Sequence, residues 1–155
     1  LGGYFSDVLE RDLKRGIAHH EAALRALGER AALEPSNALA QRNYGDQFVM
    51  KATAHNTMKD GAGALDATNR ALAVLRPLAD ADPRNKEAQH DLMFAYGERG
   101  IALMHLRRWK ESEESLQQAV AILERLRAGD PSNKEVLRDL DRLGRQLGHV
   151  RRRMP

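Results

Sequence analysis

The stretch DPRNKE (residues 82–87) decides the fold of this chain because it recurs as DPSNKE (residues 130–135). A shorter form, EPSN (residues 34–37), precedes both. The three prolines are evenly spaced, because the distance along the chain from Pro35 to Pro83 equals that from Pro83 to Pro131. An internal repeat of this length is typical of stacked supersecondary units, so this repeat interval predicts an architecture before any single motif does.

Each copy of this phrase predicts a junction between two helices. Proline fixes φ and keeps the residue before it out of the helical region, and the asparagine two positions later is a favoured N-cap. A weaker break divides each repeat near residues 107–109 and 59–61, and the same register places another at residues 11–13. We therefore expect a helix end at 2–10 and helices at about 13–33, 36–58, 62–80, 84–106, 109–128 and 132–152.

Small residues recur at the same interval and predict where helices cross most closely. Glycine within a helix costs about 1 kcal/mol relative to alanine, so a repeated glycine needs a packing reason. The three rows of equivalent small residues are Ala23, Ala71 and Ala119; Gly16, Ala64 and Ser112; and Ala52, Gly100 and Gly148. We expect backbones to approach one another at these rows.

Composition excludes several classes of protein. The 155 residues include no cysteine, which rules out a disulfide framework and a thiolate metal site. No apolar run approaches the roughly 18 residues of a membrane span, and the net charge of +3 is too mild to indicate nucleic acid by itself. We expect a chain without membrane or nucleic-acid partners, cytoplasmic in location. Because the chain begins with Leu1, we also expect a piece of a longer protein or a processed product.

The pattern of apolar and small residues resembles that of the tetratricopeptide repeat family. The match is best for Tyr96, Gly100, Leu103, Trp109, Ser112, Leu116 and Ala119, and poorer for Phe48, Ala52, His55, Gly61, Ala64, Thr68 and Ala71. The chain departs from the family in length, since the usual repeat has roughly 34 residues and the interval from Pro35 to Pro83 is longer. Seven extra residues on each side of the matched region would lengthen both helices by about two turns.

The resemblance implies an all-α fold, a right-handed α-solenoid of antiparallel helix hairpins forming one domain over residues 1–155. Its parts would be a partial unit at 1–33, repeats at 34–81 and 82–129, and a C-terminal half-repeat or capping helix at 130–155. The long repeats with Asp-Pro-x-Asn junctions also look like those of bacterial signalling proteins, including stretches that follow serine/threonine kinase domains.

In the resembled family, the first helix of each pair lines a concave groove that binds partner peptides or helices. Carried over by position, the groove lining would be Arg42, Asp46, Val49, Thr53, Asn56, His90, Phe94, Gly97, Ile101, Met104, Arg138, Arg142, Arg145 and His149. This face runs from polar through apolar to basic, which suits a partner with an apolar anchor and an acidic end. Asp46, Phe94 and Arg142 replace the asparagine of the family's carboxylate-binding members, so that activity is not expected.

The sequence thus predicts a non-enzymatic protein–protein interaction scaffold, with a structural spacer or self-association module as the alternative. In the alternative, the outer apolar side of the helix at 13–33 pairs with a second copy to form a homodimer. No cofactor or metal is expected: His19-His20-Glu21 begins like a zinc-protease motif, but Leu24 stands where the second histidine would be. No serine has a nearby base and orienting group, so no catalytic residue is assigned.

Two features of the sequence allow two interpretations each. Trp109 is either a binding hot spot or, as we favour, a packing aromatic at a helix start. Arg138, Arg142 and Arg145 share a helix face that is either a site for an acidic peptide or the solvated side of a capping helix, and both can hold.

Overall fold

The computed structural model describes the backbone of residues 2–154 and the side chains of residues 8–154; the ends of the expected 1–155 domain, Leu1 and Pro155, lie outside this part. The described backbone forms six helices and no strand, which confirms the all-α prediction. The helices are α1 (Gly2–Leu33), α2 (Ala38–Thr57), α3 (Gly61–Ala81), α4 (Lys86–His105), α5 (Trp109–Gly129) and α6 (Lys134–Arg151).

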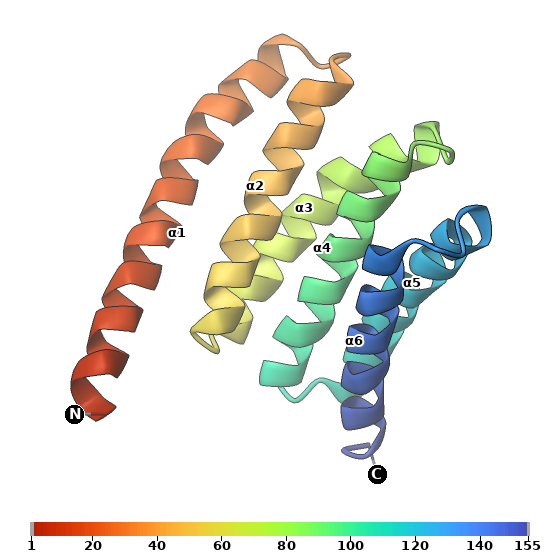
Figure 1. The fold of residues 1–155 in the computed structure, drawn as a ribbon. Coiled ribbons are helices and arrows are strands. Elements are labelled where there is room, and N and C mark those ends of the chain that lie inside the picture. Colours follow the sequence, from red (N-terminus) through yellow and green to blue (C-terminus); the bar gives the residue numbers. More distant parts are fainter. Residues whose placement is uncertain (1, 155) are drawn as a thin grey trace.

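The six helices pack in chain order as antiparallel neighbours (Figure 1). α2 also contacts α4, and Figure 1 shows α2, α4 and α6 in front of α3 and α5. The core runs along the seam between the layers and includes Phe48, Leu75, Met93, Leu116 and Leu143. No helix within residues 2–154 is both long and apolar enough to cross a membrane.

The repeated proline–asparagine phrase forms the junctions after α1, α3 and α5, as predicted. The side chains of Asn37 and Asn85 each accept a hydrogen bond from an amide three residues later, at 3.1 Å. Asn133 does the same for the amide of Val136 at 3.2 Å. Each asparagine therefore satisfies a free amide at the start of the next helix, which typically stabilises a helix by about 1 kcal/mol.

A second repeated contact fastens the first two junctions. Gln41 Nε2 donates to the carbonyl oxygen of Ala31 at 2.7 Å, and Gln89 Nε2 donates to that of Ala79 at 2.9 Å. The two glutamines are separated by one repeat interval, and so are the two alanines. Each bond satisfies a carbonyl in the last turn of one helix from the first turn of the next.

The turns within the hairpins repeat as well. Lys59 and Arg107, which occupy equivalent positions of successive repeats, have φ values of 59° and 58°, in the left-handed region. Asp60 then caps α3 by accepting the amide of Gly63 at 3.0 Å, whereas Arg108 makes no side-chain cap at α5. The weaker break predicted between the junctions is therefore confirmed for these two units.

The break predicted at residues 11–13 is wrong, because α1 continues from Gly2 to Leu33 without interruption. A left-handed, non-glycine residue costs about 1 kcal/mol. At Lys59 and Arg107 the packing of two long helices offsets this cost. Residues 11–13 include neither glycine nor proline, so nothing in the local sequence interrupts the helix there. The other predicted helices agree with α2 to α6 to within two residues at each end.

The small-residue rows lie at close crossings in the inner units. Ala64, Ala71, Ser112 and Ala119 are fully buried. A Cβ atom built on Gly100 would lie 2.6 Å from Cγ and Cδ2 of Leu116, and Ser112 Oγ donates to the Gly100 carbonyl at 2.8 Å. At the two ends of the array the same rows face open space or flexible side chains: a Cβ on Gly16 would meet nothing within 4 Å.

Candidate functional site

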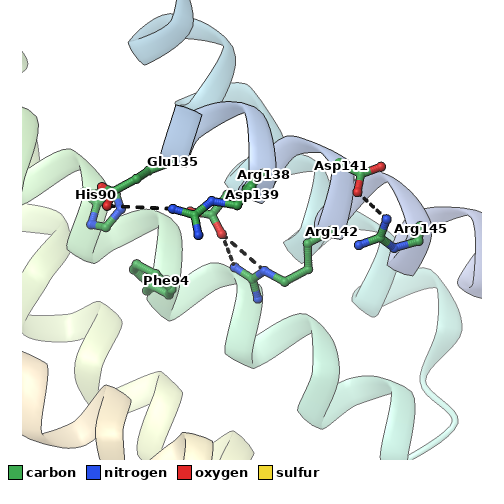
Figure 2. Close-up of a pocket in the computed structure, with 8 residues that line it drawn as sticks. All are labelled: His90, Phe94, Glu135, Arg138, Asp139, Asp141, Arg142 and Arg145. Atoms are coloured by element: carbon green, nitrogen blue, oxygen red, sulfur yellow. Dashed lines mark hydrogen bonds and ion pairs between the residues drawn. The ribbon is translucent and has the colours of Figure 1, made fainter. Parts of the chain in front are cut away.

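A surface pocket of about 470 Å³ lies between α4 and α6 (Figure 2). α4 contributes His90 and Phe94, which are four residues apart and so share a face of the helix. α6 contributes three arginines at the same kind of spacing, together with three carboxylates. The α6 residues are Glu135, Arg138, Asp139, Asp141, Arg142 and Arg145.

Phe94 is held in the pocket from two sides. The His90 ring meets it edge-on, with the ring centroids 4.7 Å apart and the planes at 83°. The guanidinium carbon of Arg142 lies 5.8 Å from the Phe94 centroid, within the range of a cation–π contact. The phenyl ring is thus a fixed apolar surface that α4 presents toward α6.

The arginines of α6 are paired with acids of their own helix, as the dashed lines in Figure 2 show. Arg142 donates through Nη2 to Asp139 Oδ1 at 3.0 Å, Arg138 lies 3.9 Å from Glu135, and Arg145 pairs with Asp141. The basic end expected from the sequence is therefore locally charge-balanced. The acids stand three or four positions before the arginines, a spacing that the sequence already contained.

Arg142 differs from its two neighbours in how firmly it is held. Its side chain is 34% exposed, against 77% for Arg138 and 71% for Arg145. Exposed ion pairs contribute about 0–1 kcal/mol, so a carboxylate from outside can replace such a pair at little cost. Arg142 is pre-positioned by Asp139 and Phe94, and the other two arginines form an exposed rim.

The predicted groove residues on α2 are engaged within the fold. Arg42 bridges to α4, donating through Nη1 to Glu87 at 2.5 Å and pairing with the buried carboxylate of Asp91. The hydrogen bond to Asp91 raises the pKa of Arg42. Burial and then the nearby Asp91 charge raise the pKa of Asp46 to about 6, while Arg42 and His90 act in the opposite direction.

The structure places Val49 and Asn56 inside the helical packing. Both are buried, and Val49 belongs to the core. Asn56 Nδ2 donates across to α4, to the Glu98 carbonyl at 3.0 Å and to Glu98 Oε2 at 2.7 Å. Thr53 is exposed and its hydroxyl donates to the Val49 carbonyl at 3.1 Å. These three residues are not part of the pocket.

The remaining predicted residues also lie away from the pocket. Ile101 is half-buried, Met104 packs against the core, and His149 meets the Trp109 ring edge-on at 6.4 Å between centroids. Trp109 is itself half-buried against the core, which is the packing role we favoured. The pocket thus brings together five of the predicted residues: His90, Phe94, Arg138, Arg142 and Arg145.

A second, smaller pocket of about 210 Å³ adjoins the first and shares His90 and Glu135 with it. It lies where the first turns of α4 and α6 meet. Its other lining residues are Arg42, Lys86, Glu87, Leu126, Asp130, Asn133 and Val136. Of these, Arg42 was among the predicted groove residues; the others were not predicted, because most of them belong to the junctions, whose residues have a structural role as helix caps.

The side chains of residues 8–154 include no group of three or more histidines and carboxylates placed to hold a metal ion. The arrangement that the pocket does offer is a fixed aromatic surface beside exchangeable ion pairs. Comparison with known protein families and with curated proteins found no match to this chain.

Proposed function

We propose that this chain is a non-enzymatic protein–protein interaction scaffold, a right-handed α-solenoid similar to tetratricopeptide repeats. The common register of caps, turns and small residues, set by the interval between the prolines, supports a regular stack. Its partner would be an acidic protein segment with an apolar anchor. The resemblance of the junctions to those in bacterial signalling proteins supports a cytoplasmic signalling context, including the tail of a serine/threonine kinase.

The observation that carries the proposal is the α4–α6 pocket, with Phe94 fixed between His90 and Arg142. An apolar side chain of a partner can cover the Phe94 ring, and a neighbouring carboxylate can take the place of Asp139 or Glu135 on an arginine. Both groups are already in position, so binding would lose little conformational entropy at the centre of the site.

Selection of random displayed peptides on the immobilised chain tests this proposal. We expect enrichment of peptides in which a carboxylate stands close to an aromatic or large aliphatic residue. Phe94→Ala and Arg142→Gln should each weaken the selected peptides about tenfold or more, as expected for a central anchor. Arg127→Gln, which removes a similar exposed ion pair on α5 with Glu124, serves as the matched control. Binding that survives both pocket substitutions would place the site elsewhere.

Self-association is the second candidate function, and α1 provides the observation that favours it. The equivalent helices α3 and α5 each pack between two neighbours, whereas within the described residues α1 shares extensive contacts with α2 and with no other helix. Leu9 of α1 is 57% exposed. Sedimentation velocity over a hundredfold range of concentration distinguishes the two: a constant monomer would exclude the homodimer and leave the scaffold proposal intact.

A further inference from the structure

The two adjoining pockets form one groove along α4 and α6 whose two ends differ in charge. The end that includes the first turns of α4 and α6 is lined by the carboxylates of Glu87, Asp130 and Glu135 and by the cations of Arg42 and Lys86, and Arg42 also pairs with the buried carboxylate of Asp91. At the other end three arginines are balanced by exposed or half-exposed pairs with acids of their own helix. The groove therefore has excess negative charge at one end, and at the other it has exchangeable arginines with Phe94 beside Arg142.

From this polarity we infer that the bound segment is bipolar, with a basic side chain at the Glu87–Glu135 end and a carboxylate at the Arg142 end. The inference rests on the proposed function and adds the basic group, which the sequence pattern did not indicate. Electrostatic complementarity of this kind sets the register and the orientation of a partner more than its affinity.

The available carboxylates at the acidic end are those of Glu87 and Glu135. Both side chains are largely exposed, at 74% and 73%. Asp91 is buried against Arg42, and Asp130 accepts from the amide and hydroxyl of Ser132 at 3.2 and 2.8 Å. Arg42 is bound to Glu87 and Asp91, so this end has spare negative charge.

Helix geometry sets the spacing of the two charges in the ligand. Glu135 and Arg142 are seven residues apart on α6, which at roughly 1.5 Å per residue corresponds to about 10 Å. An extended peptide advances about 3.3 Å per residue. The basic and acidic side chains of an extended ligand should therefore stand about three residues apart, with an apolar residue next to the acidic one, opposite Phe94.

Fluorescence anisotropy with four dye-labelled ten-residue peptides tests the inference at low ionic strength. Each peptide contains one central phenylalanine. Two of the peptides have lysine and glutamate three residues apart with the phenylalanine between them, one peptide in each chain direction. The third peptide has glutamate at both of these positions, and the fourth has lysine at both. We expect one bipolar peptide to bind about fivefold more tightly than either uniform peptide, the scale of one exposed ion pair.

Substitution of the acidic end supplies the second arm. Glu87→Gln with Glu135→Gln should bring the bipolar peptide to within about twofold of the peptide with two glutamates, whereas Glu114→Gln with Glu124→Gln on α5 should change neither. Helicity measured by circular dichroism verifies that each variant is folded.

The outcomes separate the inference from the proposed function. Tightest binding of a uniform peptide, or a bipolar preference that survives Glu87→Gln with Glu135→Gln, would overturn the inference alone. If no probe binds and no displayed peptide is selected, the proposed function fails and takes the inference with it.

Discussion

The close crossing at Gly100 gives the sharpest test of the packing. A Cβ atom there would lie 2.6 Å from Cγ and Cδ2 of Leu116, which is fully buried and cannot move without displacing other core atoms. Overpacking of this kind costs about 1–3 kcal/mol, and the better helix propensity of alanine returns about 1 kcal/mol. Gly100→Ala should therefore lower the free energy of unfolding by about 1 kcal/mol.

Gly144 on α6 is the matched control, because a Cβ there would meet nothing within 4 Å. Gly144→Ala keeps only the propensity gain and should raise the free energy of unfolding by up to about 1 kcal/mol. Urea denaturation followed by circular dichroism at the helix band measures both variants against the parent chain. The same glycine-to-alanine change is expected to lower the free energy of unfolding at Gly100 and to raise it at Gly144. The test therefore depends on the sign of each change and not on the absolute values.

A double-mutant cycle identifies the clash as the cause. Leu116→Ala alone should cost about 2–5 kcal/mol as a buried large-to-small change. With those atoms gone, Gly100→Ala should become stabilising, giving a coupling of about 1 kcal/mol or more between the two sites. If Gly100→Ala stabilises the parent chain as Gly144→Ala does, the crossing is looser than described and the small-residue rows do not mark close contact.

Two further predictions concern the ion cluster between α2 and α4. Burial raises the pKa of Asp46 from 3.8 to about 6, so its ionised form is disfavoured in the folded state. The contribution of Asp46 to the free energy of unfolding is therefore present below pH about 4 and is lost as the pH rises through about 6. Asp46→Asn should abolish this decline in stability. In denaturant titrations at pH 7.5 it should stabilise the chain by about 1 kcal/mol, a value that allows for solvent screening at a half-buried site. An unchanged dependence of stability on pH would contradict the raised pKa of Asp46. Arg42→Ala should lower the free energy of unfolding by about 2–4 kcal/mol in the same assay, because it leaves buried Asp91 unpaired. Arg145→Ala, which removes an exposed ion pair, should lower it by less than about 0.5 kcal/mol. Equal losses of stability in the two variants would show that Arg42 makes no more than a surface contact.

The sequence predicted the helices and the junctions between them through features that act locally. Proline and asparagine at fixed intervals determine where a helix can begin. The small residues recur at the same interval as the prolines, so the two patterns support each other. The break at residues 11–13 was predicted wrongly because it rested on the repeat register alone. Residues 11–13 contain neither glycine nor proline, so the local sequence is compatible with the uninterrupted α1.

The site was harder to predict, for a different physical reason. The position of a residue within the repeat determines which helix and which helix face it lies on. Whether that face is buried depends on the neighbouring helix. Asn56, for example, is buried and bonded to Glu98 of α4, whereas Met104, one repeat later in the same row, is only partly buried. The charge at the pocket depends on side chains that reach across helices, such as Arg42 to Asp91, and such pairs have no signature in a single sequence.

The glutamine bonds at the first two junctions have a consequence for how the array loses structure. At the third junction the equivalent positions are Leu137 and Arg127, so no side chain ties the end of α5 to the start of α6 in this way. In a linear array each boundary contributes its own coupling energy, and the weakest boundary separates first. The boundary before α6 therefore lacks a coupling that the first two boundaries have, and the attachment of α6, with the groove that it shares with α4, depends on the apolar packing of Val136, Leu143, Leu147 and Val150.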